Sequence, residues 1–209
     1  MRSFALLPAA ERAGCHLVLA GGYDPRVQEN IDYFAQLEDL ARSMNLSTEN
    51  VTFLRSPSDA EKVWLLRRAD CLLYTPTGEH FGIVPLEAMY CRTPVLAVDS
   101  GGPRETVVDG VTGWLREPTS EAFAAALGDV LLHKDHLGLV GDAGRRRVEE
   151  HFSFGAFASN LDRALVDVVR ARHEGQGKGF SWLTGLAVAF HFSLAMCVLF
   201  YMTFGTPLP

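Results

Sequence analysis

The amino-acid sequence predicts an α/β fold built on a doubly wound parallel sheet, followed by a C-terminal transmembrane helix. Short apolar runs typical of buried strands alternate with segments of helical periodicity over residues 1–172. Glycine-containing links follow several of these runs, and ligands of such sheets bind at the carboxyl ends of the strands. Residues 180–204 then form a run without Asp, Glu, Lys or Arg that is long enough to cross a membrane.

Composition describes a globular chain and disfavours several kinds of site. The 209 residues are 48% hydrophobic and 21% charged, which excludes a disordered chain. A net charge of −6 argues against a nucleic-acid partner. The cysteines at 15, 71, 91 and 197 form no C-x-x-C pair, so we expect reduced thiols and no metal site.

The expected elements follow from apolar periodicity and helix-capping residues. Residues 1–7 are interpreted as the tail of a helix whose start is absent. Ser58 and Glu61 form the pattern of a capping box at the start of the second full helix. Strands are predicted at 16–20, 51–54, 71–74, 94–98 and 113–115, and helices at 30–44, 58–69, from 83, from 101, 121–133, 137–151 and 154–172.

The fold is organised around residues 75–90, which join the strand at 71–74 to a helix that begins near Ile83. A strand, a glycine loop and a helix start place free backbone N–H groups and a positive dipole end at the sheet edge, which suits an anion. Glu79 lies in the loop and Glu87 on the helix. Two carboxylates beside an anion-binding site suit a ligand that is a diphosphate with hydroxyl-rich groups at both ends, such as a nucleotide-sugar.

Residues 79–87 resemble the E-x7-E motif of retaining, family-4-type glycosyltransferases with the GT-B fold. The match widens through Pro94–Val98 and the Gly-Gly-Pro-Arg-Glu run at 101–105, and residues 20–24 and 51–55 fit as well. Over residues 1–170 the chain is most similar to the mannosyltransferases of asparagine-linked glycosylation. These proteins add α-1,3 and then α-1,6 mannose to a dolichol-linked precursor.

The resemblance implies a role for each residue of the motif. Glu79 would contact the donor mannose and stabilise an oxocarbenium-like transition state, and Glu87 would bind the ribose. Donor-binding residues would be His80, Phe81, Gly82, Ile83, Val84 and Glu87, with backbone N–H groups of 81–84 facing sugar and phosphate. For His80, a general base, a backbone-positioning role and simple exposure all remain open. The resemblance implies no metal and no cofactor.

The implied activity is transfer of mannose from GDP-mannose to a dolichol-diphosphate-linked oligosaccharide at the cytosolic face of the endoplasmic reticulum. Other glycosyltransferases of the same pathway are a further class of partner. Two alternatives stay open: an inactive, membrane-anchored fragment that at most binds partners, and a GT-B transferase that uses another nucleotide-sugar. The motif itself specifies neither guanine as the base nor mannose as the sugar of the donor.

The resemblance covers only the C-terminal, nucleotide-sugar-binding domain, and we expect the chain alone to be an incomplete enzyme. In the family, a central strand lies between those at 16–20 and 71–74 and is followed by an arginine and a lysine that hold the diphosphate. Neither that strand nor a convincing equivalent of those side chains is found here. The expected organisation is a domain at 1–172, a linker at 173–179, the span at 180–204 and a tail at 205–209, with positive charges keeping the main domain cytosolic.

Overall fold

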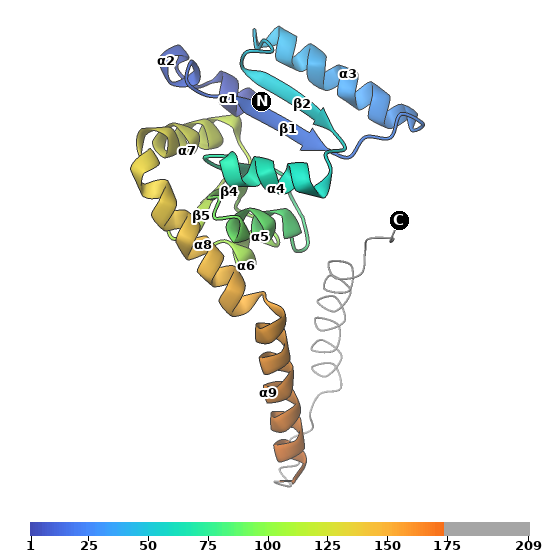
Figure 1. Ribbon diagram of the computed structural model, residues 1–209, viewed down its shortest axis with the longest axis vertical. Helices are drawn as coiled ribbons and strands as arrows, with labels where there is room; N and C mark the ends of the chain where they lie inside the picture. The colour runs from blue at the N-terminus through green and yellow to red at the C-terminus, as the bar shows by residue number, and fades with distance from the viewer. Residues whose placement is uncertain (174–209) are drawn as a thin grey trace. The chain divides into compact units, whose positions relative to one another are not determined.

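The structure is a computed structural model of the 209-residue chain, and it describes residues 1–173. The chain divides into two compact units, Met1–Glu149 and Glu150–Pro209. The first unit contains all strands of the described part and the predicted motif (Figure 1). Of the second unit, the structure describes the end of one helix and the helix α9, Phe154–His173.

Five parallel strands form two sheets in the first unit. β1 (Leu17–Gly21) pairs with β2 (Val51–Arg55), and β4 (Val95–Val98) pairs with β3 (Leu72–Tyr74) on one edge and β5 (Gly113–Arg116) on the other. No ladder joins β1 to β3, so the sheet is interrupted at the place where the sequence analysis expects an absent central strand. The α/β class and the parallel strands are confirmed.

The helices follow the predicted order. They are α1 (Arg2–Ala5), α2 (Ala9–Arg12), α3 (Gln28–Ser43), α4 (Asp59–Arg68), α5 (Ile83–Tyr90), α6 (Pro103–Thr106), α7 (Ser120–Leu132) and α8 (Leu137–His151), with a 3₁₀ turn at Lys134–His136. The capping box of α4 is present, because the Ser58 hydroxyl accepts from the Glu61 N–H and the Glu61 carboxylate accepts from the Ser58 N–H. The helix tail predicted at residues 1–7 is the single turn α1, and Pro8 separates it from α2.

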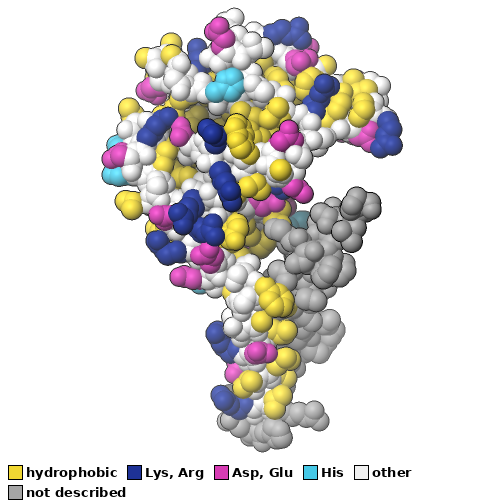
Figure 2. Space-filling model, in the orientation of Figure 1, with side chains coloured by type: hydrophobic (Ala, Val, Ile, Leu, Met, Phe, Trp, Pro, Cys, Tyr) yellow, Lys and Arg dark blue, Asp and Glu magenta, His cyan; other side chains and the backbone are white. Residues whose placement is uncertain are grey.

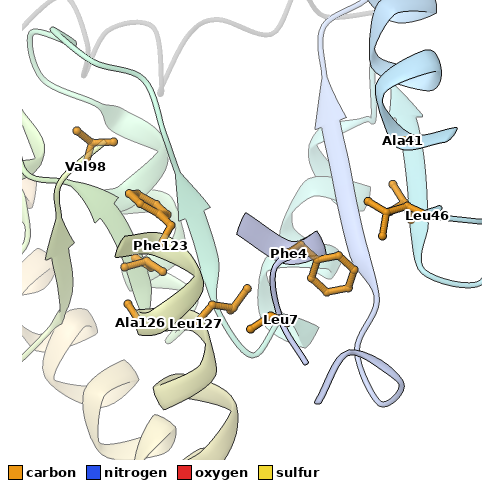
Figure 3. Packing of buried hydrophobic residues seen from close by; sticks show 10 residues of the cluster. Phe4, Leu7, Ala41, Leu46, Val98, Phe123, Ala126 and Leu127 are labelled. Atoms are coloured by element: carbon orange, nitrogen blue, oxygen red, sulfur yellow. The ribbon is translucent and has the colours of Figure 1, made fainter. Parts of the chain in front are cut away.

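The core of the first unit is continuous even though its sheet is not. Figure 3 shows Phe4 of α1, and Leu7 just after this helix, between the β1–β2 side of the core, where Leu46 lies, and the α7 side, where Phe123 and Leu127 lie. β4 contributes a strand whose residues are all at most 1% exposed. Helix α1 therefore contributes apolar contacts across the interruption where no backbone ladder exists.

The cysteines at 15, 71 and 91 are free thiols, as expected. Burial is the main cause that raises the pKa of Cys71, to about 12, so this thiol is protonated and unreactive at neutral pH. Cys197 lies outside the described residues.

None of the helices between residues 1 and 173 has the length and apolar character that a membrane crossing requires. The predicted span at 180–204 and its flanking linker and tail lie outside the described residues, and they stay predictions. The same holds for the domain boundaries at 172, 179 and 204.

Candidate functional site

The loop between β3 and α5 has the backbone conformation that its glycines allow. Gly78 and Gly82 have φ values of 73° and 72°, in the left-handed region that favours glycine. Gly82 is also the N-cap of α5, and a Cβ there would lie 3.3 Å from Cε1 and Oη of Tyr74. The loop therefore turns tightly against the last residue of β3 before the helix begins.

Glu79 is half-buried at this turn. Its Oε1 accepts a hydrogen bond of 3.1 Å from the N–H of His80. Burial is the main cause that raises the pKa of Tyr74. The negative charge of Glu79 and a hydrogen bond between the two side chains raise this pKa further. The Tyr74 phenol is therefore protonated at neutral pH and is a donor close to the carboxylate of Glu79.

A second glycine loop, after β4, holds the first loop in place. The N–H of Gly102 donates to the carbonyl oxygen of Glu79 over 2.8 Å. A Cβ at Gly101 would overlap the Glu79 carbonyl, and one at Gly102 would overlap the backbone of Phe81. Only glycines permit this close backbone approach, so the two loops form one unit at the carboxyl edge of the β3–β4–β5 sheet.

Glu87 lies one turn into α5 and is 19% exposed. Its Oε1 accepts a hydrogen bond of 2.8 Å from Nζ of Lys62, which projects from α4. This bond is the main cause that raises the pKa of Lys62, so the lysine is charged at neutral pH. A charged partner on one oxygen fixes the carboxylate and leaves its other oxygen as an acceptor.

The remaining predicted residues surround the same turn. The side chain of His80 is exposed, and those of Phe81 and Ile83 are half-buried. Val84 is 36% exposed and, like Ile83, belongs to the first turn of α5, where backbone N–H groups have no acceptor within the helix. The positions predicted as a donor site therefore lie together on one loop and one helix start.

The sequence does not predict Lys62 or Tyr74 as residues of the site. The only local signal for Lys62 is its place on α4 three residues after Asp59, and this indicates an exposed surface pair rather than a bond to α5. The apolar pattern places Tyr74 in a buried strand, and the signal for a role in the site is its position as the last residue of β3. Both contacts depend on how the helices and the loop pack.

The described part of the chain offers no cluster of His, Cys, Asp and Glu that could hold a metal ion. On the face shown in Figure 2, basic and acidic side chains are interspersed. This face therefore presents no extended field of one sign.

Comparison with known proteins gives consistent results. The family model "Glycosyl transferases group 1" matches residues 1–147. The chain is 48% identical over 154 residues to the human alpha-1,3/1,6-mannosyltransferase ALG2 and 46% identical over 164 residues to the mouse protein of the same name. These matches cover 74% and 78% of this chain. Among solved structures, sucrose-phosphate synthase from Thermosynechococcus elongatus matches with a TM-score of 0.66 and 28% identity, over 81% of this chain and 42% of that one.

The matches cover 37% of the human relative and 39% of the mouse relative. The chain thus spans about two fifths of the length of these curated relatives.

Proposed function

Because the chain belongs to the family of group 1 glycosyl transferases, we propose that it forms the donor-binding part of an α-1,3/1,6-mannosyltransferase. The transferase moves mannose from GDP-mannose to a dolichol-diphosphate-linked oligosaccharide, the precursor for protein N-glycosylation. The observation that carries the proposal is the 46–48% identity to relatives named as alpha-1,3/1,6-mannosyltransferases. The compact arrangement of Glu79 and Glu87 around the β3–α5 turn supports it.

In the proposed mechanism, Glu79 stabilises positive charge that develops on the donor sugar as its bond to the diphosphate breaks. The turn that holds this carboxylate is fixed by the bond from the Gly102 N–H, so little reorganisation is needed during the reaction. Backbone N–H groups of residues 81–84, around the start of α5, face the departing phosphate. Configuration at the sugar is retained, as in the family that the motif resembles.

Glu87 binds the nucleoside end of the same donor. Lys62 occupies one of its oxygens, and the other accepts a hydrogen bond from a ribose hydroxyl. The acceptor is held by parts of the enzyme other than this donor site.

We also propose the wider organisation of the chain. Residues 1–172 form the donor-binding domain, 173–179 a linker, 180–204 a membrane span and 205–209 a short tail. The positive side chains of Arg170, Arg172 and Lys178 precede the span, and residues 205–209 carry no charged side chain. The positive-inside rule supports a main domain on the cytosolic side of the endoplasmic reticulum membrane. Other glycosyltransferases of the pathway are the proposed protein partners.

Donor binding tests the proposal. In the longest polypeptide that the gene encodes, GDP-mannose should bind and UDP-glucose should not, as measured by calorimetry. Glu87→Ala should weaken GDP and GDP-mannose alike, because both contain the ribose. Preferential binding of UDP-glucose would reject the proposed donor, and equal GDP affinity in variant and parent would reject the ribose contact.

A further inference from the structure

An arginine at the carboxyl edge of the β1–β2 sheet lies against aromatic rings. Arg55 is the last residue of β2, and its guanidinium carbon lies 4.9 Å from the ring centroid of Tyr23 and 5.1 Å from that of Phe34. Phe34 also packs edge-on against Tyr23 and Phe53. Within residues 1–173, no carboxylate forms an ion pair with this exposed guanidinium. Its N–H donors are therefore held in one place and remain available to a ligand.

The two loops that carry this cluster are tied together by one side chain. The Ser56 hydroxyl accepts from the N–H of Tyr23 at 2.9 Å and donates to the Tyr23 carbonyl at 3.0 Å. The N–H of Ser56 in turn donates to the carbonyl of Gly21 at 2.7 Å. These bonds fix the backbone of Tyr23, and its ring packs against Arg55 and Phe34, so the binding groups are in place before a ligand arrives.

Helix α4 connects this cluster to the ribose contact proposed above. The helix begins at Asp59, four residues after Arg55, and Lys62 of its first turn holds Glu87. Since a helix rises about 1.5 Å per residue, Lys62 lies only about one turn from the loop at 55–58. A base attached to a ribose at Glu87 can therefore extend toward the carboxyl ends of β1 and β2, the edge where parallel sheets bind ligands.

We infer that Arg55, held by Tyr23 and Phe34, recognises the nucleobase of the donor and selects guanine. The inference rests on the proposed function, because it assumes a nucleotide-sugar whose ribose contacts Glu87. The planar guanidinium presents two parallel N–H donors, and guanine offers two adjacent acceptors, O6 and N7. Adenine replaces O6 with an amino donor, and a pyrimidine lacks N7. The geometry of one side chain thus discriminates between purine and pyrimidine donors and between guanine and adenine.

Nucleotide affinities test this assignment in the longest polypeptide that the gene encodes. The probes are GDP, IDP, ADP, UDP and 7-deaza-GDP, which lacks the N7 acceptor. We expect the parent to prefer GDP and IDP over ADP and UDP. Arg55→Ala should reduce the preference for GDP over UDP by roughly 5- to 150-fold, the range for a lost bidentate contact to a base. In that variant, GDP and 7-deaza-GDP should bind equally.

Matched variants separate base recognition from structure. Arg68→Ala is the control, because Arg68 is another exposed arginine that stacks on an aromatic ring, 5.0 Å from the Trp64 centroid, and it should leave the preference unchanged. Arg55→Lys keeps the charge and loses the planar pair of donors, so its preference should fall as in Arg55→Ala.

The outcomes distinguish the two proposals. A parent that prefers GDP, together with an Arg55→Ala variant of unchanged preference, overturns the role of Arg55 and leaves the proposed function standing. A parent that prefers UDP or ADP overturns both.

Discussion

Replacing Gly102 with alanine should displace the loop between β3 and α5 without unfolding the protein. The added Cβ would come closer to the Phe81 backbone than the 3.0 Å that real Cβ atoms respect, and backbone cannot rotate away as a side chain can. Since carbon atoms pack best at about 3.5–4.0 Å, the loop at 79–82 must move by about 1 Å.

The energetic cost follows from these contacts. Overpacking of this kind costs about 1–3 kcal/mol. Losing the bond from the Gly102 N–H to the Glu79 carbonyl adds about 0.5–1.5 kcal/mol. Gly102 has φ −55° and ψ −36°, which alanine adopts readily. Alanine also lowers the conformational entropy of the unfolded chain, and this stabilises the folded state by about 0.4–1 kcal/mol. The net loss, about 0.5–4 kcal/mol, is smaller than the roughly 5–15 kcal/mol stability of a typical domain.

Urea titration and a mannosyl-transfer assay measure the two effects. With a slope of about 1–3 kcal/mol per molar urea, the unfolding midpoint should fall by about 1 M. A 1 Å displacement of Glu79 should lower the transfer rate by about 100-fold.

The matched control for this experiment is Gly138→Ala in α8. A Cβ at Gly138 meets no atom within 4 Å, and alanine favours a helix. Neither the unfolding midpoint nor the transfer rate should therefore decrease in this variant. A parental midpoint and a parental rate in Gly102→Ala would show that the second loop does not hold the first. A lower midpoint with an unchanged rate would show that the position of Glu79 is not what the contact protects.

Further predictions concern Glu79, Lys62 and the C-terminal segment. Glu79→Gln should lower turnover far more than affinity for GDP-mannose, because its contact matters mainly in the transition state; unchanged turnover would remove Glu79 from the mechanism. Lys62→Met should weaken GDP binding by about 3- to 10-fold, because it removes a charged hydrogen bond whose contribution is reduced by partial exposure to solvent. Lys62→Arg should restore part of the lost affinity. A Lys62→Met variant that binds GDP as tightly as the parent would contradict the role of the bond to Glu87. Because that bond raises the pKa of Lys62 above its ordinary 10.5, its stabilisation is complete at neutral pH and should be lost only as the pH rises beyond that value. Deleting residues 180–209 should release the protein from membranes. Carbonate extraction of the intact chain provides the reference. If carbonate already extracts the intact chain from membranes, residues 180–204 do not form a membrane span.

Local patterns were sufficient to predict most elements of the first unit. The run at 94–98 is apolar without interruption, which is typical of a strand covered on both faces, and β4 is such a strand. Ser58 and Glu61 are three residues apart, so their capping box depends on no other part of the chain. The glycines at 78 and 82 mark a turn for the same local reason.

The contacts that complete the site are not local, and the sequence could not predict them. Lys62 reaches Glu87 across 25 residues, and nothing in either segment specifies the packing of α4 on α5. The pattern at 101–105 did predict a second loop at the sheet edge, but not that its glycines meet the backbone of residues 79–81. The cluster of Tyr23 and Arg55 likewise forms only because β1 and β2 pair in parallel and end at the same edge.

The burial of β4 also determines how the site should behave in amide hydrogen exchange. β4 pairs on both edges and is at most 1% exposed, whereas β1 and β2 pair only with each other and expose residues such as Val18. Amides in β4 should therefore exchange only through global unfolding, and those in β1 and β2 through smaller openings. The sugar end of the donor site is anchored next to the slowest-exchanging strand, and the proposed base end lies on the part of the domain that opens first.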